Sequence, residues 1–287
     1  MKVLITGATG FIGSHLVTAL LKKNYKVAIT KRQESRKNTF DSMLSRIEII
    51  DSDTYHDINS GMKYFNPDIV VHLATLYINK HDPENISSLM SSNITFGAYI
   101  LEAMKENNIN YFLNIGTRWQ HINNNRYNPA NLYAATKEAF KNIMIYYEKT
   151  GIKHKTLELS DTFGTGDTRQ KIIDILISAC TKNEMVELTP GKQVLDLLHV
   201  EDVCNFITSN IRNDAFFDNE TISLSGTVIK LRDLGAMIEK ESGKKGVLGW
   251  GLKQYRENEV MKPPLYYRKV QLNNFSIEEY IKIKLRS

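Results

Sequence analysis

A tyrosine and a lysine four residues apart, Tyr133 and Lys137, could carry proton-transfer chemistry. Residues 130–150 have helical character, and this spacing places both side chains on one helical face. An ammonium beside a phenol lowers the pKa of the phenol, so Tyr133 could exchange a proton with a carbonyl or alcohol oxygen near neutral pH. Surface pairs without function also have this spacing. Thr117 makes the pattern more specific, because its hydroxyl follows the preceding expected strand and could bind the same oxygen.

A glycine-rich loop stands between the first expected strand and the first expected helix. Glycines allow a tight turn and a close approach to a pyrophosphate, and the helix N-terminus offers free N–H groups and a partial positive charge. A tight turn without a ligand is the alternative, but the position after an N-terminal strand favours a dinucleotide. The loop residues expected to contact it are Gly7, Thr9, Gly10, Phe11, Ile12 and Gly13.

The end of the second expected strand bears on which dinucleotide binds. Enzymes that use NAD place an acid there for the ribose 2′-hydroxyl, whereas a cation accommodates the 2′-phosphate of NADP. This chain has Lys31 and Arg32, with no acid before Glu34. Both could be solvated surface cations, but the missing acid favours NADPH as the cofactor.

Strand-like and helix-like stretches alternate through the first half of the chain. The expected strands are residues 1–6, 26–30, 47–50, 68–74, 111–115 and 155–160, and the expected helices are 14–23, 91–105 and 130–150. The run DIVVHLA at 68–74 is apolar, as in a strand buried on both faces. The alternation predicts an α/β fold with a Rossmann-like, doubly wound parallel sheet.

The pattern loosens after about residue 165. Helices are expected at 171–181, 231–242 and 276–284, and a strand at 187–188. We expect residues 1–165 to form an NADP-binding domain and residues 166–287 a smaller substrate-binding domain over the sheet edge where ligands bind. The segment 195–224 is expected to return to the main sheet.

Composition is that of a globular protein. The 287 residues are 42% hydrophobic and 24% charged with a net charge of +5, which excludes a disordered chain. Charges of both signs are interleaved, so the cation excess fits an anionic ligand at least as well as nucleic acid. Cys180 and Cys204 are too few for a disulfide framework or a metal site, and no apolar run approaches the roughly 20 residues of a membrane helix. We therefore expect a cytoplasmic protein without metal, nucleic-acid or membrane partners.

Five motifs together resemble the extended short-chain dehydrogenase/reductases that act on nucleotide-activated sugars. They are TGATGFIG at 6–13, HLAT at 72–75, Thr117, YAATK at 133–137 and DLLHVEDV at 196–203. The resemblance spans nearly the whole chain and implies hydride transfer between nicotinamide and a sugar carbon. Tyr133 would be the general acid/base, Lys137 would bond the nicotinamide ribose, and Thr117 would take a role usually held by Ser or Thr.

The resemblance implies further contacts and an oligomeric state. Asp51, after the third expected strand, would meet the adenine. Members of the family often dimerise through a four-helix bundle, which here would use the helices at 91–105 and 130–150, so a homodimer is expected. The other residues implied along the cofactor and beside the nicotinamide are Leu73, Ala74, Thr75, Leu159 and Ser160.

The residues after Thr117 separate the reactions of this family. In the 4,6-dehydratases an Asp-Glu pair follows this threonine, and bifunctional epimerase-reductases carry a cysteine two residues later. This chain has Arg118, Trp119 and Gln120. The 4-epimerases retain NAD, which fits poorly with the two cations after the second strand. What remains is net reduction of a 4-keto sugar by a dissociable NADPH.

Three stretches resemble the CDP-abequose and CDP-paratose synthases, which reduce C4 of a CDP-4-keto-3,6-dideoxyhexose for bacterial O-antigen. They are VAITKR at 27–32, HLATLYINK at 72–80 and YRENEVM at 255–261. The resemblance implies a 4-keto-6-deoxy or 3,6-dideoxy sugar, with CDP favoured and dTDP or GDP as alternatives. Arg256 would make bidentate bonds to the substrate diphosphate, or else be a solvated loop charge.

More residues are expected around the sugar. Asp161 stands where Asn is common in the family and would face the sugar. Many members have Arg where this chain has Leu195, so a second phosphate contact would be missing or would come from Arg268 or Lys269. Trp119 could instead pack beneath the C-terminal domain. The residues expected to line the substrate pocket are Tyr77, Arg118, Trp119 and Gln120.

Two other functions remain open. One is a nucleotide-sugar 4-epimerase with tightly held NAD. The other is a non-catalytic NADP-binding sensor of the same fold. Such sensors typically lack the tyrosine of the pair, so the intact Tyr133 and Lys137 argue against this reading.

Overall fold

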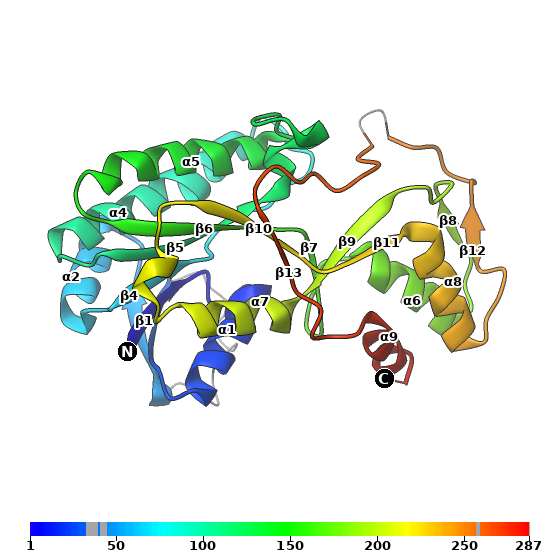
Figure 1. Ribbon diagram of the computed structural model, residues 1–287, viewed down its shortest axis with the longest axis horizontal. Coiled ribbons are helices and arrows are strands. Elements are labelled where there is room, and N and C mark those ends of the chain that lie inside the picture. Colours follow the sequence, from blue (N-terminus) through cyan, green and yellow to red (C-terminus); the bar gives the residue numbers. More distant parts are fainter. Residues whose placement is uncertain (33–39, 41–44, 257–258, 287) are drawn as a thin grey trace.

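The main element of the computed structural model is a large parallel sheet (Figure 1). The structure describes residues 1–32, 40, 45–256 and 259–286. Within them the sheet has eight strands in the order β13-β10-β6-β5-β4-β1-β2-β3, all paired in parallel. The strands are β1 (Lys2–Thr6), β2 (Lys26–Lys31), β3 (Ile47–Asp51), β4 (Ile69–His72), β5 (Tyr111–Thr117), β6 (Lys153–Leu159), β10 (Thr221–Ser225) and β13 (Lys269–Gln271).

Helices cover both faces of this sheet. Side chains alternate along a strand, so Val3 and Ile5 pack into one core with α1 and α7, while Leu4 packs into the other with α2, α4 and α5. The expected Rossmann-like, doubly wound parallel sheet is therefore confirmed. These helices are α1 (Phe11–Lys22), α2 (Tyr55–Phe65), α4 (Phe96–Glu106), α5 (Leu132–Glu148) and α7 (Val200–Asn210).

The helix expected at 91–105 is longer and irregular. Helix α3 (Asn85–Met90) continues through a π turn (Ser91–Thr95) into α4. Asn93 in this turn is 1% exposed, and its amide bonds the backbone N–H and carbonyl of Leu76 at 2.7 and 3.0 Å. The same amide donates to the Thr136 hydroxyl at 2.9 Å. The π turn thus attaches the loop after β4 to helix α5, and such turns often occur at functional sites.

The later part of the chain builds a second core. Strands β7, β9 and β11 form one small sheet and β8 and β12 another, and three helices pack with them. Helix α7 packs on α1, and β10 and β13 extend the main sheet. The division into two domains near residue 165 stays a prediction. The elements of the second core are β7 (Asp161–Phe163), α6 (Ile172–Lys182), β8 (Val186–Leu188), β9 (Val194–His199), β11 (Thr227–Lys230), α8 (Leu231–Ser242), β12 (Leu248–Trp250) and α9 (Ile277–Arg286).

None of the helices in the described ranges is both long enough and apolar enough to cross a membrane.

Candidate active site

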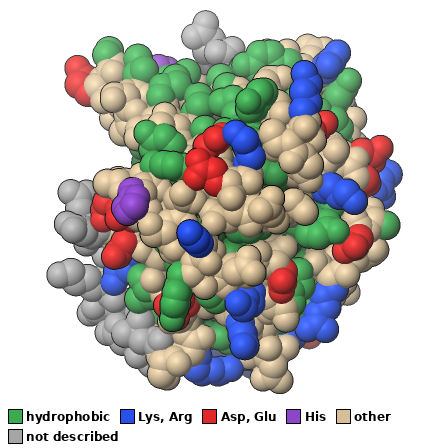
Figure 2. All heavy atoms as spheres, turned by 90° about the vertical axis from the view of Figure 1, so that its left-hand side faces the viewer, with side chains coloured by type: hydrophobic (Ala, Val, Ile, Leu, Met, Phe, Trp, Pro, Cys, Tyr) green, Lys and Arg blue, Asp and Glu red, His purple; other side chains and the backbone are tan. Residues whose placement is uncertain are grey.

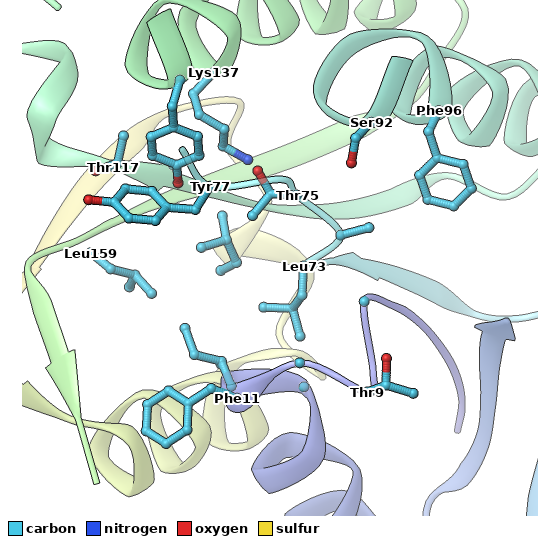
Figure 3. Close-up of a pocket in the computed structure, with 18 of the residues that line it drawn as sticks. Thr9, Phe11, Leu73, Thr75, Tyr77, Ser92, Phe96, Thr117, Lys137 and Leu159 are labelled. Atoms are coloured by element: carbon cyan, nitrogen blue, oxygen red, sulfur yellow. The ribbon is translucent and has the colours of Figure 1, made fainter. Parts of the chain in front are cut away.

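A cavity of about 640 Å³ opens at the carboxyl ends of the main-sheet strands (Figure 3). The segments after β1, β4, β5 and β6 and the first turns of α5 line it. Ligands of open parallel sheets bind at this edge. The predicted site residues in its lining are Gly7, Thr9, Gly10, Phe11, Ile12, Gly13, Arg32, Leu73, Ala74, Thr75, Tyr77, Thr117, Trp119, Tyr133, Lys137, Leu159, Ser160 and Asp161.

The glycine loop leaves no room for larger residues. Gly7 has φ +67°, and a Cβ there would lie 2.5 Å from the backbone nitrogen of Ala74. A Cβ on Gly13 would lie 2.3 Å from the Gly7 carbonyl oxygen. Gly10 is the N-cap of α1, where no described side chain caps the helix, so its first N–H groups are available to an anion. This cradle fits the pyrophosphate of a dinucleotide.

Asp51, the residue expected to meet the adenine, does not line the described cavity. Asp51 ends β3 opposite Lys31, and neither residue lines the cavity as the structure describes it. Ser52 and Asp53 line it instead. Strand pairing continues one residue beyond Asp51, because the Ser52 N–H donates to the Lys31 carbonyl at 3.1 Å. Arg32 alone of the two predicted cations reaches the lining.

Burial dominates the electrostatics of the tyrosine–lysine pair. Asn131 caps α5 by accepting the Ala134 N–H at 2.9 Å, which places Tyr133 and Lys137 in the first two turns. Burial raises the pKa of Tyr133 to about 12, although a hydrogen bond with Thr75 opposes this shift. Burial also lowers the pKa of Lys137 to about 8. The expected lowering of the phenol pKa is therefore wrong, because desolvation by burial outweighs the Thr75 hydrogen bond and the Arg169 charge, which both lower the pKa. At neutral pH the phenol carries its proton.

Thr117 ends β5, and its hydroxyl oxygen has one described hydrogen bond, as an acceptor. The hydroxyl oxygen accepts the Trp119 N–H at 3.4 Å, which leaves its own proton available to a ligand. In Figure 3 Thr117 and Tyr77 lie on the same side of the cavity, while the Lys137 ammonium points toward Thr75. The Tyr77 ring meets the Tyr133 ring edge-on at 5.0 Å. Thr117, Tyr133 and Lys137 thus line one cavity.

Three residues expected around the substrate lie outside the described lining. Arg118 is 3% exposed, and its guanidinium donates to the Asp196 carboxylate and to the Pro264 carbonyl. Gln120 is 1% exposed, and its amide is occupied by protein partners. Arg256 lies on an exposed loop before Glu257 and Asn258, which fall outside the described residues. Arg118 and Gln120 are held by partners that local sequence does not report.

Two cations of the lining were not predicted. Arg169 pairs with Asp167 at 2.7 Å, and its guanidinium lies over the Phe11 ring at 5.0 Å. Lys171, the N-cap of α6, pairs with Asp161 at 3.3 Å. The sequence feature that could have indicated them is a pair of cations in the loop between β7 and the N-terminus of α6.

Neither cation proposed to replace the missing family arginine reaches the cavity. Lys269 begins the edge strand β13, and Arg268 precedes it; both are exposed and absent from the described lining. Glu34, the first acid after the predicted cation pair, lies outside the described residues. The other lining residues that sequence reasoning missed are Thr30, Ser52, Asp53, Ser91, Ser92, Thr95, Phe96, Tyr99, Ile115, Gly116 and Thr162.

The chain is similar to known enzymes that act on nucleotide sugars. The chain is 29% identical over 289 residues to a CDP-abequose synthase of Yersinia pseudotuberculosis, covering all of both chains. It is 26% identical to a CDP-abequose synthase of Salmonella muenchen, covering 91% of this chain and 87% of the relative. The crystal structure of UDP-glucose 4-epimerase with UDP-glucose from Thermotoga maritima superposes with a TM-score of 0.83 at 19% identity, covering 100% and 98% of the two chains.

The model of the NAD-dependent epimerase/dehydratase family matches residues 3–224, which include the glycine loop, Thr117 and the tyrosine–lysine pair. The predicted membership in the extended short-chain dehydrogenase/reductases is confirmed by this match, and the chain belongs to the NAD-dependent epimerase/dehydratase family.

Proposed function

We propose that this protein reduces the C4 ketone of a nucleotide-activated 4-keto-6-deoxy or 3,6-dideoxy sugar with NADPH, CDP being the favoured nucleotide and dTDP or GDP the alternatives. The observation that carries the proposal is that one cavity is lined both by Thr117, Tyr133 and Lys137 and by Arg32. The full-length likeness to CDP-abequose synthase supports the choice of nucleotide. The setting would be bacterial O-antigen biosynthesis in the cytoplasm.

Reduction needs a hydride and a proton, and NADPH held in this cavity would supply the hydride. Tyr133 donates its proton to the C4 oxygen, since burial keeps the phenol protonated at neutral pH. Thr117 donates a hydrogen bond to the same oxygen, because its own oxygen already accepts a backbone N–H. Lys137 bonds the nicotinamide ribose. The C=O bond becomes CH–OH, and the phenolate left on Tyr133 regains a proton from solvent.

The cofactor site is assigned from the lining. The backbone of the glycine loop would hold the pyrophosphate, and Arg32 would bond the 2′-phosphate of NADPH. Arg169 and Lys171 are the cations of the lining proposed to meet the substrate diphosphate. Arg256, predicted for this contact, lies outside the described lining.

The 4,6-dehydratase reaction is disfavoured by the residues after Thr117. Elimination of water needs a further acid and base, but the positions following Thr117 hold Arg118, paired with Asp196, and Trp119. The second candidate function is a 4-epimerase that retains NAD, which the family match keeps open. A non-catalytic sensor is disfavoured by the presence of both Tyr133 and Lys137.

A homodimer through α4 and α5 is part of the proposal. Ile145 and Tyr146 of α5 are 52% and 58% exposed, and Tyr99 of α4, which also lines the cavity, is 43% exposed. Figure 2 shows hydrophobic side chains gathered on the upper part of the face that carries these helices. This exposed apolar surface supports the proposed homodimer.

Consumption of NADPH tests the proposal. Purified protein would be offered CDP-, dTDP- and GDP-4-keto-6-deoxy sugars, each freshly made by its dehydratase, and the CDP-linked 3,6-dideoxy ketone. The loss of NADPH absorbance with one nucleotide is the expected result. Protein that purifies with bound NAD and interconverts 4-epimers without net oxidation would instead be an epimerase. Binding of NADPH without either reaction would favour the sensor.

A further inference from the structure

Gln120 is buried beside the active site without lining the cavity described above. Both ends of its amide are bonded. Oε1 accepts the backbone N–H of Thr117 at 3.1 Å, and Nε2 donates to Oε2 of Glu138 at 2.6 Å. A buried amide with both ends bonded has a defined orientation. Gln120 therefore holds the backbone of the residue whose hydroxyl would bind the substrate oxygen.

Glu138 joins this contact to the helix that carries the tyrosine. It follows Lys137 on α5, and its carboxylate also pairs with Lys141 at 2.9 Å. Lys141 in turn donates to the Tyr267 hydroxyl at 2.9 Å and lies 4.8 Å from the centre of that ring. The contacts thus run from the end of β5 through Gln120 into α5.

Segment 264–267 holds the same turn from the other side. The Leu265 N–H donates to Oδ1 of Asn124 at 2.8 Å. The His121 ring stacks on the Tyr266 ring at 5.2 Å. Figure 1 shows the chain after β12 crossing back over the molecule to reach β13, and this segment belongs to that crossing. The turn after β5 is therefore held between α5 and the returning chain.

We propose that Gln120 is a positioning residue that sets the spacing between Thr117 and Tyr133, an inference that rests on the proposed reduction. Two hydroxyls on different elements must reach one substrate oxygen, and O–H···O bonds span only about 2.5–3.0 Å. The Gln120–Glu138 bond joins the two elements by a direct side-chain contact. A shift of about 1 Å at such a site can lower a rate by roughly a hundredfold.

A single variant, Gln120→Glu, and a double variant that exchanges the side chains of residues 120 and 138 test this role. In Gln120→Glu two carboxylates would meet where the present bond spans 2.6 Å, so one of them would have a raised pKa. The other charged groups around them are Lys141 on α5 and the buried His121–Glu158 pair. We expect kcat at about pH 8 to fall at least about tenfold, with partial recovery near pH 6 as a shared proton restores an O–H···O bond.

The double variant Gln120→Glu/Glu138→Gln is the matched control. It keeps an acceptor for the Thr117 N–H and lets the residue 138 amide donate to residue 120. We expect its kcat within about threefold of wild type, without the acid recovery of the single variant, and NADPH affinity within about twofold in all variants. A merely structural role would give no pH-dependent recovery. A double variant no better than the single one overturns the inference.

Hydrogen exchange at the Thr117 amide provides a readout that needs no reaction. Exchange should be at least about tenfold faster in Gln120→Leu than in wild type, because the amide loses its acceptor. Unchanged exchange would overturn the inference. A wild-type protein that turns over no nucleotide sugar defeats the proposed function, and the amide exchange then decides the role of Gln120 by itself.

Discussion

Replacement of Asp196 by asparagine should strongly destabilise the protein. The carboxylate is 2% exposed, and one oxygen accepts from the Arg118 guanidinium and, at 2.5 Å, from the Ser225 hydroxyl. The other oxygen accepts from the Ser160 hydroxyl at 3.1 Å and the Gly226 N–H at 2.7 Å. Whichever way an asparagine amide were turned, its NH₂ group would face a donor that cannot become an acceptor, either Arg118 or the Gly226 N–H.

The magnitude follows from the charge left behind. Removing one partner of a buried ion pair costs about 3–5 kcal/mol, and Arg118 is only 3% exposed. Asp196→Asn should therefore lower the free energy of unfolding by about 3–5 kcal/mol. Arg118→Met leaves the carboxylate three neutral donors, so the expected loss is smaller, about 2 kcal/mol. In the double variant no cation is stranded, and its loss should be at least about 1 kcal/mol below the sum of the single losses.

Urea unfolding of the wild type, both single variants and the double variant measures these differences at neutral pH. Equal m-values are needed for the free energies to be compared. A loss below about 1 kcal/mol in Asp196→Asn would refute the reasoning. So would an Arg118→Met variant that is less stable than Asp196→Asn.

Three further changes test the cofactor side of the site. Lys137→Met should raise the free energy of unfolding at pH 7 by up to about 3 kcal/mol, since burial lowers the pKa of Lys137 from 10.5 to about 8. Between pH 8 and 10.5 the unfolded wild-type chain binds more protons than the folded one, so the stability of the wild type rises with pH and the advantage of the variant fades. A variant less stable than wild type at pH 7 would contradict this. Arg32→Glu should weaken NADPH binding at least about tenfold and NADH binding much less. The control Lys31→Glu, outside the lining, should change the ratio of the two affinities less. Fluorescence titration measures both affinities, and equal losses for the two cofactors would speak against a 2′-phosphate contact. Gly13→Ala should abolish NADPH binding, because its Cβ would lie 2.3 Å from the Gly7 carbonyl oxygen, and calorimetric binding at wild-type affinity would show that the loop is not the cradle.

Features that depend on local spacing could be predicted from the sequence. The glycine loop must turn tightly after β1, and a spacing of four on a helix places Tyr133 and Lys137 on one face, so the cavity lining contains both. Strands β1, β2 and β4 were predictable because alternate residues face two cores, which makes these strands mostly apolar. Strand β13 is three residues long and was not predicted.

Features that depend on distant partners could not be predicted. Arg118 and Gln120 lie within three residues of Thr117 in sequence, yet Asp196 and Glu138 hold them away from the described cavity lining. The pKa of Tyr133 was misjudged because burial depends on the surrounding fold. Periodicity gives an approximate helix, so the π turn that orients Asn93 was also missed.

The central claim is hydride transfer from NADPH to C4 of the sugar. The direct measurement is turnover of a CDP-4-keto-6-deoxy sugar, and of its 3,6-dideoxy counterpart, with NADPH that carries deuterium at nicotinamide C4. The deuterium is placed on one face of the ring in one experiment and on the other face in a second. Proton and deuterium NMR would then locate the label in the product. We predict one deuterium at sugar C4 from one face of the cofactor, with one NADPH oxidised for each alcohol formed. Deuterium at another carbon, or exchange of C4 epimers without net NADPH oxidation, would contradict the account.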